Sequence, residues 1–212
     1  DVTDETIFMQ LKMENGKIVV PGGVKYQVLV LPDHKVLSLA VLKKTEELLR
    51  QGAQIIASKP EKTASLVDGE KGQKQFAQLV DKIWGEIGTE KGEKKVGKGL
   101  IAWGTTAREF LLAKGIPADF ELAESNNPTE YDYVHYTVGN SDVYFVSNQK
   151  AERWKMNARF RVTGRQPELW DANTGEIRDA VAFSQNNDIT NVPLSLEPYE
   201  SVFVVFDRPI DK

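Results

Sequence analysis

The sequence contains no cysteine, and its 212 residues include only two histidines, His34 and His135. Without cysteine the chain has no disulfide bonds, no thiolate metal ligands and no cysteine nucleophile. Two histidines are too few for a histidine-rich zinc site. We therefore predict that the chain binds no metal and needs no cofactor.

Long apolar runs and an excess of basic residues are also missing. The longest aliphatic runs, Tyr26–Leu31 and Val202–Phe206, are far shorter than the roughly 18 residues of a membrane-spanning helix, so we expect no membrane span. Residues 1–122 carry a net charge of +1 and residues 123–212 a net charge of −5, which argues against a nucleic-acid partner. The composition of the whole chain, 41% hydrophobic and 27% charged residues, suffices for a packed core.

The first 122 residues alternate between strand and helix patterns. Tyr26–Leu31 predicts a strand that is buried on both faces. A helix between an N-cap at Ser38 and a C-terminal Gly52, followed by a strand over 53–57, completes a βαβ unit. Apolar residues at helical spacing predict a second amphipathic helix over residues 73–84.

The pattern continues more loosely up to residue 122. Gly88–Gly99, rich in glycine and lysine, predicts an exposed loop or hairpin, and residues 100–103 predict a short buried strand. Thr106 and Glu109 form a capping box that opens a helix, and Gly115 ends it. The predicted fold of residues 1–122 is an α/β parallel-sheet domain of flavodoxin-like or class I glutamine amidotransferase-like type.

The period changes near an Asn-Asn-Pro linker at residues 126–128. In Trp154–Val162 the even positions are apolar and the odd ones polar, and residues 134–138 and 190–196 alternate in the same way. Turn residues separate these runs. Residues 123–212 are therefore predicted to form an antiparallel β-sandwich of about seven strands without a helix.

Few residues in the α/β half are candidates for a catalytic or ligand-binding role. An open parallel sheet binds ligands at the carboxyl ends of its strands, where Asp33 and His34 follow the first strand. An Asp-His pair can act as acid and base, but it is more often a turn before a helix. There is no glycine-rich phosphate loop and no Gly-x-Ser-x-Gly elbow, and Thr105 and Thr106 are better explained as helix caps.

Paired carboxylates and tryptophans are the remaining candidates. Glu46 with Glu47, and Glu130 with Asp132, could serve a glycosidase, but both pairs are typical of solvated surfaces, so we predict no catalytic residue.

Periodicity places three of the four tryptophans in the core, namely Trp84, Trp103 and Trp154. Trp170 is less determined and is the one candidate for a carbohydrate contact. His135 alternates with Val134 and Tyr136, which predicts that it faces outward.

Several sequence segments together resemble one region of large bacterial glycoside hydrolases that belong to the α-L-rhamnosidase-like family 106 group. They are Tyr26–Pro32, Gly97–Gly99, Asp142–Asn148, Phe160–Asp171 with Thr174-Gly175, and Leu194–Phe206. In such proteins a catalytic (β/α)₈ barrel is followed by an amidotransferase-like α/β domain and β-sandwich domains, and this chain resembles the following, C-terminal portion. The resemblance transfers no catalytic residue, because the family's acids and calcium belong to the barrel.

The leading hypothesis is therefore an accessory, non-catalytic region of a polysaccharide-degrading glycoside hydrolase that is inactive alone. Its partner would be the catalytic barrel of the same parent chain, and it would brace the barrel, complete its cleft or mediate homo-oligomer contacts. A start at Asp1 without a leader is typical of an excerpt, and the resemblance implies a periplasmic or secreted protein. The alternatives are a carbohydrate-binding module that uses Trp170 and a small hydrolase that uses Asp33 and His34.

Overall fold

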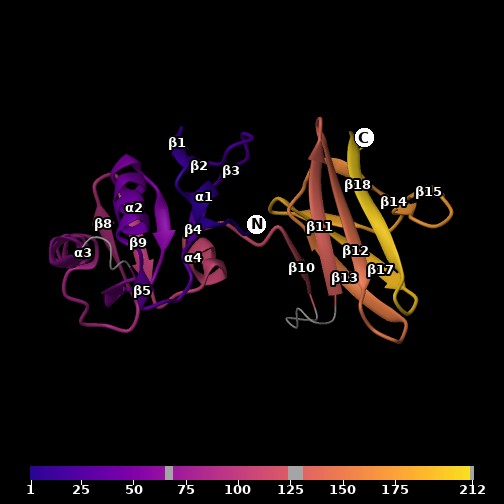
Figure 1. Cartoon of the computed structure of the whole chain (residues 1–212). Helices are drawn as coiled ribbons and strands as arrows, with labels where there is room; N and C mark the ends of the chain where they lie inside the picture. The colour runs from indigo at the N-terminus through magenta and orange to yellow at the C-terminus, as the bar shows by residue number, and fades with distance from the viewer. Residues whose placement is uncertain (65–68, 124–130, 211–212) are drawn as a thin grey trace. The chain divides into compact units, whose positions relative to one another are not determined.

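The computed structural model describes residues 1–64, 69–123 and 131–210 (Figure 1). Over these residues the chain is mostly β-structure, with four helices and several separate sheets. It divides into two compact units, unit 1 (Asp1–Gly115) and unit 2 (Ile116–Lys212).

The border between the units lies seven residues earlier than the predicted border after residue 122. Strand β10 (Phe120–Leu122) explains the difference, because it pairs antiparallel with β13 (Trp154–Phe160) of unit 2. This pairing joins residues far apart in the sequence, so local patterns gave no sign of it.

The centre of unit 1 is a four-stranded sheet of order β4-β6-β9-β8. Strands β4 (Val28–Val30), β6 (Gln54–Ile56) and β9 (Gly99–Trp103) are parallel, and β8 (Gly92–Val96) forms an antiparallel hairpin with β9. The prediction that the first strand is buried on both faces is wrong: β4 lies at the edge of the sheet, and Val30 is 51% exposed.

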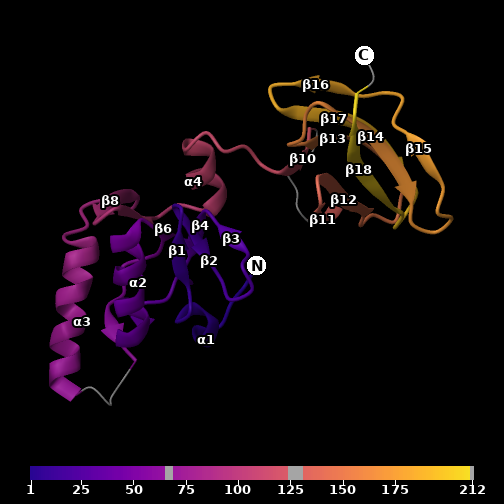
Figure 2. The same cartoon turned by 90° about the horizontal axis from the view of Figure 1, so that it is seen from above.

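Helices cover both faces of this sheet, as the view in Figure 2 shows. The predicted βαβ unit is confirmed as β4, α2 (Leu39–Gln51) and β6, and the predicted amphipathic helix as α3 (Gly69–Trp84). Both helices pack on one face. The buried side chains they share with the sheet include Leu42, Leu48, Leu49, Phe76, Val80, Ile83, Trp84, Ile55 and Ile101.

Helix α4 (Ala107–Ala113) covers the opposite face, where Phe110 packs on Ile56 and Ala102. The predicted capping box is present, since the side chain of Thr106 accepts from the backbone N–H of Glu109 and the Glu109 carboxylate accepts from that of Thr106. The remaining elements of unit 1 are α1 (Glu5–Phe8), the antiparallel sheet of β1 (Lys12–Glu14), β2 (Lys17–Val19) and β3 (Lys25–Tyr26), and the parallel pair β5 (Val36–Leu37) and β7 (Lys62–Thr63).

Unit 2 is a β-sandwich of two antiparallel sheets, of order β10-β13-β17-β16 and β11-β12-β18-β14-β15. The described part of unit 2 has nine strands and no helix; eight of the strands lie within residues 123–212, where about seven were predicted. Beyond β10 and β13 the strands are β11 (Tyr131–Val138), β12 (Ser141–Asn148), β14 (Arg165–Asp171), β15 (Ile177–Asp179), β16 (Ser184–Asn186), β17 (Ile189–Leu196) and β18 (Ser201–Pro209).

The core of unit 2 follows the predicted alternation in β13 and β17. Met156, Ala158 and Phe160 point inward from β13, and Val192 and Leu194 from β17. The five-stranded sheet contributes its own inward side chains, Tyr144, Val146, Val202, Val204 and Phe206. Each sheet therefore buries one face against the other.

A substitution at Gly99 tests how tightly β9 packs in unit 1. A Cβ atom there would lie 2.5 Å from the carbonyl oxygen of Leu49 and closer still to that of Ala53. We expect Gly99→Ala to lower the free energy of unfolding by about 1–3 kcal/mol in urea denaturation, since neither backbone atom can give way. Gly88→Ala is the control, because nothing lies within 4 Å of its Cβ position. Equal stability of the two variants would contradict this packing.

Candidate functional site

The Asp33-His34 pair forms a turn rather than a catalytic pair. The backbone N–H of His34 donates to the carbonyl oxygen of Pro32 at 2.8 Å, and both side chains are exposed. An acid/base pair would need a sheltered setting to bind and activate a substrate.

A cavity of about 890 Å³ lies just beyond the carboxyl end of β6, lined by Lys59, Glu61 and Phe76 among others. Two of its charged groups, those of Lys59 and Glu61, are already engaged. The ammonium of Lys59 donates to the carbonyl oxygen of Gly85 at 2.6 Å, and Glu61 forms a 2.6 Å ion pair with Lys35.

The first of the two carboxylate pairs, Glu46 and Glu47, is engaged in ion pairs. Glu46 contacts the Lys82 ammonium at 2.6 Å and Glu47 that of Lys44 at 3.1 Å. Glu130 lies outside the described residues, and Asp132 is exposed and accepts a hydrogen bond from the backbone N–H of Tyr133.

Trp170 is the exposed member of the four tryptophans. Trp84 is buried, as predicted, and Trp103 and Trp154 are partly buried against their cores. Trp170 lies on β14 with 36% of its surface exposed, and its indole N–H donates to the Glu168 carboxylate at 3.0 Å.

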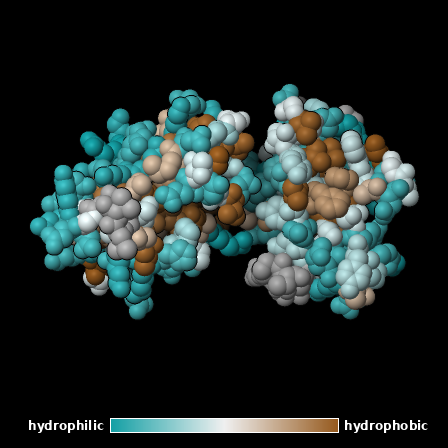
Figure 3. Space-filling view, viewed as in Figure 1, coloured by the Kyte–Doolittle hydropathy of each residue, from teal (hydrophilic) through white to brown (hydrophobic). Residues whose placement is uncertain are grey.

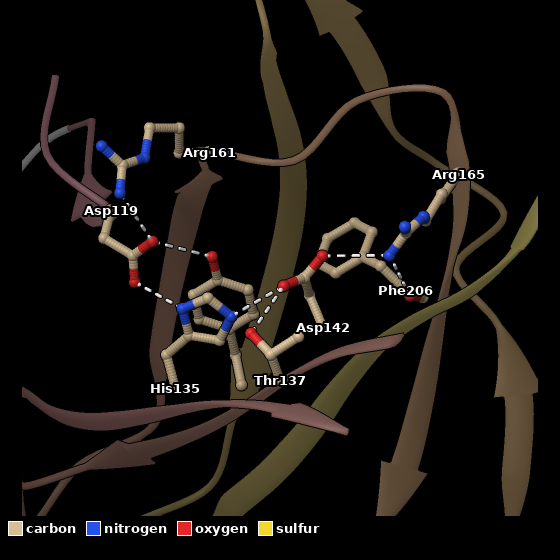
Figure 4. Close-up of polar contacts among 8 residues, drawn as sticks. Asp119, His135, Thr137, Asp142, Arg161, Arg165 and Phe206 are labelled. Atoms are coloured by element: carbon tan, nitrogen blue, oxygen red, sulfur yellow. Dashed lines mark hydrogen bonds and ion pairs between the residues drawn. The ribbon is translucent and has the colours of Figure 1, made fainter. Parts of the chain in front are cut away.

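The most developed polar cluster in the described chain surrounds His135, which the sequence predicted to face outward (Figure 4). That prediction is wrong. His135 pairs across the strands with Tyr144, whose side chain is fully buried, so the odd-numbered residues of β11 face inward. The even-numbered ones, Val134, Tyr136 and Val138, are exposed. The predicted alternation is present in β11, but its aliphatic side faces outward.

The imidazole of His135 lies between two carboxylates. Its Nδ1 is 2.9 Å from Oδ2 of Asp119, and its Nε2 is 3.1 Å from Oδ1 of Asp142. The ring stacks on Tyr144, with centroids 4.0 Å apart and planes 10° apart. A carboxylate can only accept hydrogen bonds, so both ring nitrogens must donate, and this geometry fits the imidazolium form.

The electrostatics of the cluster favour its charged form. Burial alone would lower the pKa of His135, but the hydrogen bonds and charges of Asp119 and Asp142 raise it above its ordinary value of 6.5. Burial alone would raise the pKa of Asp119, yet His135, Arg161 and Tyr144 together hold it below its ordinary value. Burial, then the charge and hydrogen bond of Asp119, raises the pKa of Tyr144, so its phenol stays protonated and donates to Asp119 at 3.2 Å.

Two arginines complete the cluster from the outside. Arg161 contacts Asp119 at 3.4 Å, and Arg165 contacts Asp142 at 3.0 Å and the carbonyl oxygen of Phe206 at 3.2 Å. Each carboxylate therefore has several donors, and neither ring nitrogen of His135 is left to accept a proton. Because Asp119 immediately precedes β10 and His135 lies on β11, the cluster joins the two sheets of the sandwich.

The described residues hold no group of three or more metal-ligating side chains suited to an ion. In the His135 cluster, the carboxylates of Asp119 and Asp142 are already paired with His135, Arg161 and Arg165. Within the same described residues, no helix combines the length and apolarity needed to cross a membrane.

Comparison with known proteins assigns the family. The model of glycoside hydrolase family 106, described as α-L-rhamnosidase, matches residues 2–185. The chain belongs to glycoside hydrolase family 106. It is 33% identical over 207 residues to a protein of Formosa agariphila named provisionally as a β-glucuronidase.

One solved structure agrees with this family assignment, and a second one shares the fold alone. A rhamnosidase of Novosphingobium sp. PP1Y superposes with a TM-score of 0.84 and 29% identity over 95% of this chain. A β-galactosidase of Bacillus circulans sp. alkalophilus shares the fold, with a TM-score of 0.52 and 10% identity. The match covers 86% of this chain and 33% of the β-galactosidase chain.

The family 106 chain is much shorter than its relatives. It matches 97% of its own length to the Formosa protein but only 17% of that protein, and it spans 19% of the Novosphingobium rhamnosidase. The chain thus spans less than one fifth of the length of these two glycoside hydrolase homologues.

The raised pKa of His135 predicts a pH-dependent stability. The folded state holds the proton more tightly than the unfolded state, so the stabilisation is complete below pH 6.5 and is lost as the pH rises through the folded pKa. We expect urea denaturation to show falling stability over that interval, and His135→Gln to flatten the slope. His34→Gln, at the exposed histidine, is the control. An unchanged slope in His135→Gln would contradict the imidazolium assignment.

Proposed function

We propose that this chain is the C-terminal, non-catalytic accessory region of a longer glycoside hydrolase that acts on polysaccharide, with an α-L-rhamnosidase-like parent activity. The observation that carries the proposal is that nearly the whole chain matches less than one fifth of the Formosa protein and of the Novosphingobium rhamnosidase. Glycosidases need two carboxyl groups that face a substrate. In the His135 cluster, Asp119 and Asp142 are instead both engaged by cations.

Three finer statements belong to the same proposal. Unit 1, with helices on both faces of a mainly parallel sheet, would be a reduced amidotransferase-like domain that lacks the cysteine nucleophile. The partner would be the catalytic barrel of the same parent chain. The parent would act in the periplasm or outside the cell. The resemblance in sequence to the family's post-barrel segment supports each of these statements.

Activity assays test the proposal. We expect the purified 212-residue chain to release no aglycone from aryl α-L-rhamnosides or aryl β-D-glucuronides, while the longer polypeptide is active on one of them. In that longer polypeptide, Asp119→Asn should lower thermal stability but leave kcat unchanged, because its carboxylate touches only protein groups. Turnover by the chain alone that one carboxylate substitution abolishes would overturn the accessory role.

The exposure of Trp170 favours a second candidate, a carbohydrate-binding module, because aromatic rings stack on sugars. Under this alternative, titration calorimetry with oligosaccharides would show saturable binding that Trp170→Ala abolishes and Tyr199→Ala, at a 68% exposed aromatic elsewhere in unit 2, retains. We expect no such binding, since the indole N–H of Trp170 already donates to Glu168. Loss of binding in Trp170→Ala alone would favour the module.

A further inference from the structure

We infer that the outer face of the five-stranded sheet in unit 2 is a docking surface for another part of the same longer polypeptide. The inference rests on the proposed accessory role and identifies the surface through which that role is exerted.

The central feature is an apolar row that crosses all five strands. The pairing register places one apolar side chain of each strand directly beside the next, in the order Val134, Phe145, Phe203, Trp170 and Ile177. The rings of Phe145 and Phe203 have centroids 4.9 Å apart. At the two ends of the apolar row, Val134 is 42% and Ile177 is 57% exposed.

A second, shorter row extends the apolar surface. Tyr136 lies beside Val143, and Val143 beside Val205, which is only 2% exposed, so this row is open to solvent over β11 and not over β18. Tyr136 is 62% exposed, and Val138, at the tip of the same strand, is 65% exposed. Figure 3 shows hydrophobic side chains gathered over β11, β12 and β18 on this side of unit 2.

The outer face of the four-stranded sheet provides an internal comparison. There Lys155 pairs with Ser195, Asn157 with Pro193, and Arg159 with Asn191, so almost every outward position is polar. Antiparallel sheets that face water are normally polar in this way. One outer face of the same sandwich is therefore suited to water, while the other carries contiguous apolar side chains that mark an interaction site.

Polar groups border the apolar face on two sides. Beside Val205, Glu168 accepts from Arg208 at 2.7 Å, and Arg208 also pairs with Asp179. On the opposite side Asp132, Ser147 and Ser201 form a polar row. An apolar centre with a polar rim is the anatomy of a protein–protein interface.

A protein surface of the same polypeptide fits this face better than a sugar. Carbohydrate sites combine aromatic rings with free hydrogen-bonding groups, whereas the apolar row ends in aliphatic Val134 and Ile177 and the Trp170 N–H is engaged. The relatives are several times longer than this chain, so the rest of the polypeptide is present at high effective concentration. The occupant we infer is an apolar, polar-rimmed patch on that remainder.

Hydroxyl-radical footprinting tests the inference without any substitution. In the 212-residue chain at low concentration, Trp170 and Tyr136 should oxidise readily, and in the longer polypeptide several-fold more slowly. Tyr199, which is 68% exposed outside this face, should react alike in both. Equal oxidation of Trp170 and Tyr136 in the two molecules overturns docking, whereas the activity assays that test the accessory role are unaffected. Protection that appears in the chain alone as its concentration rises identifies a second copy as the occupant and also overturns the inference.

A matched pair of variants provides the second measurement. Ile177→Lys, on edge strand β15, should make Trp170 oxidation several-fold faster in the longer polypeptide and leave the thermal midpoint of the 212-residue chain unchanged. Ser184→Lys, at an exposed position of edge strand β16 on the other sheet, should change neither. Continued protection of Trp170 in Ile177→Lys would count against docking at this face.

Discussion

The alternation of side chains across the five-stranded sheet is the constraint on which the rest of unit 2 depends. A sandwich buries one face of each sheet. In every strand, therefore, one of the two alternating sets of side chains points into the core and the other points outward. The pairing of His135 with Tyr144 sends the odd-numbered residues of β11 inward and Val134 outward beside Phe145. The His135 cluster and the apolar face are therefore two consequences of one register, and a slip of one residue would exchange them.

Hydrophobicity alone does not select that register, because both faces of β11 are apolar. The inward side chains include Tyr131 and Tyr133, and the outward ones include Val134 and Tyr136. The His135 cluster supplies the missing specificity, since its imidazolium meets Asp119 and Asp142 only when β11 is in register. Partly buried ion pairs often add little net stability, because desolvation opposes the Coulomb attraction. Their contribution here is better understood as the choice of one strand alignment over another.

Local signals predict helix starts well, whereas the place of β10 and the orientation of β11 depend on pairing between residues far apart in the sequence. Ser38 and Thr106 are caps recognisable from neighbouring residues, and both mark helix starts in the structure. The place of β10 depends on the distant pairing of Phe120 with Phe160. His135 was assigned to the wrong face because an outward face that binds another protein surface looks, in sequence, like an inward one.

The apolar outer face that makes β11 ambiguous in the sequence is also the surface on which our functional account of this member of glycoside hydrolase family 106 depends. Its His135 cluster fixes the alignment of β11 in the sandwich, and its unusual feature is an apolar outer face. The most direct measurement is the solvent exposure of Ile177 and Trp170 in an experimental structure of the longer polypeptide. Burial of both side chains, which are 57% and 36% exposed in this chain, under another part of that polypeptide is the predicted result. Exposure of both to solvent there would contradict the account.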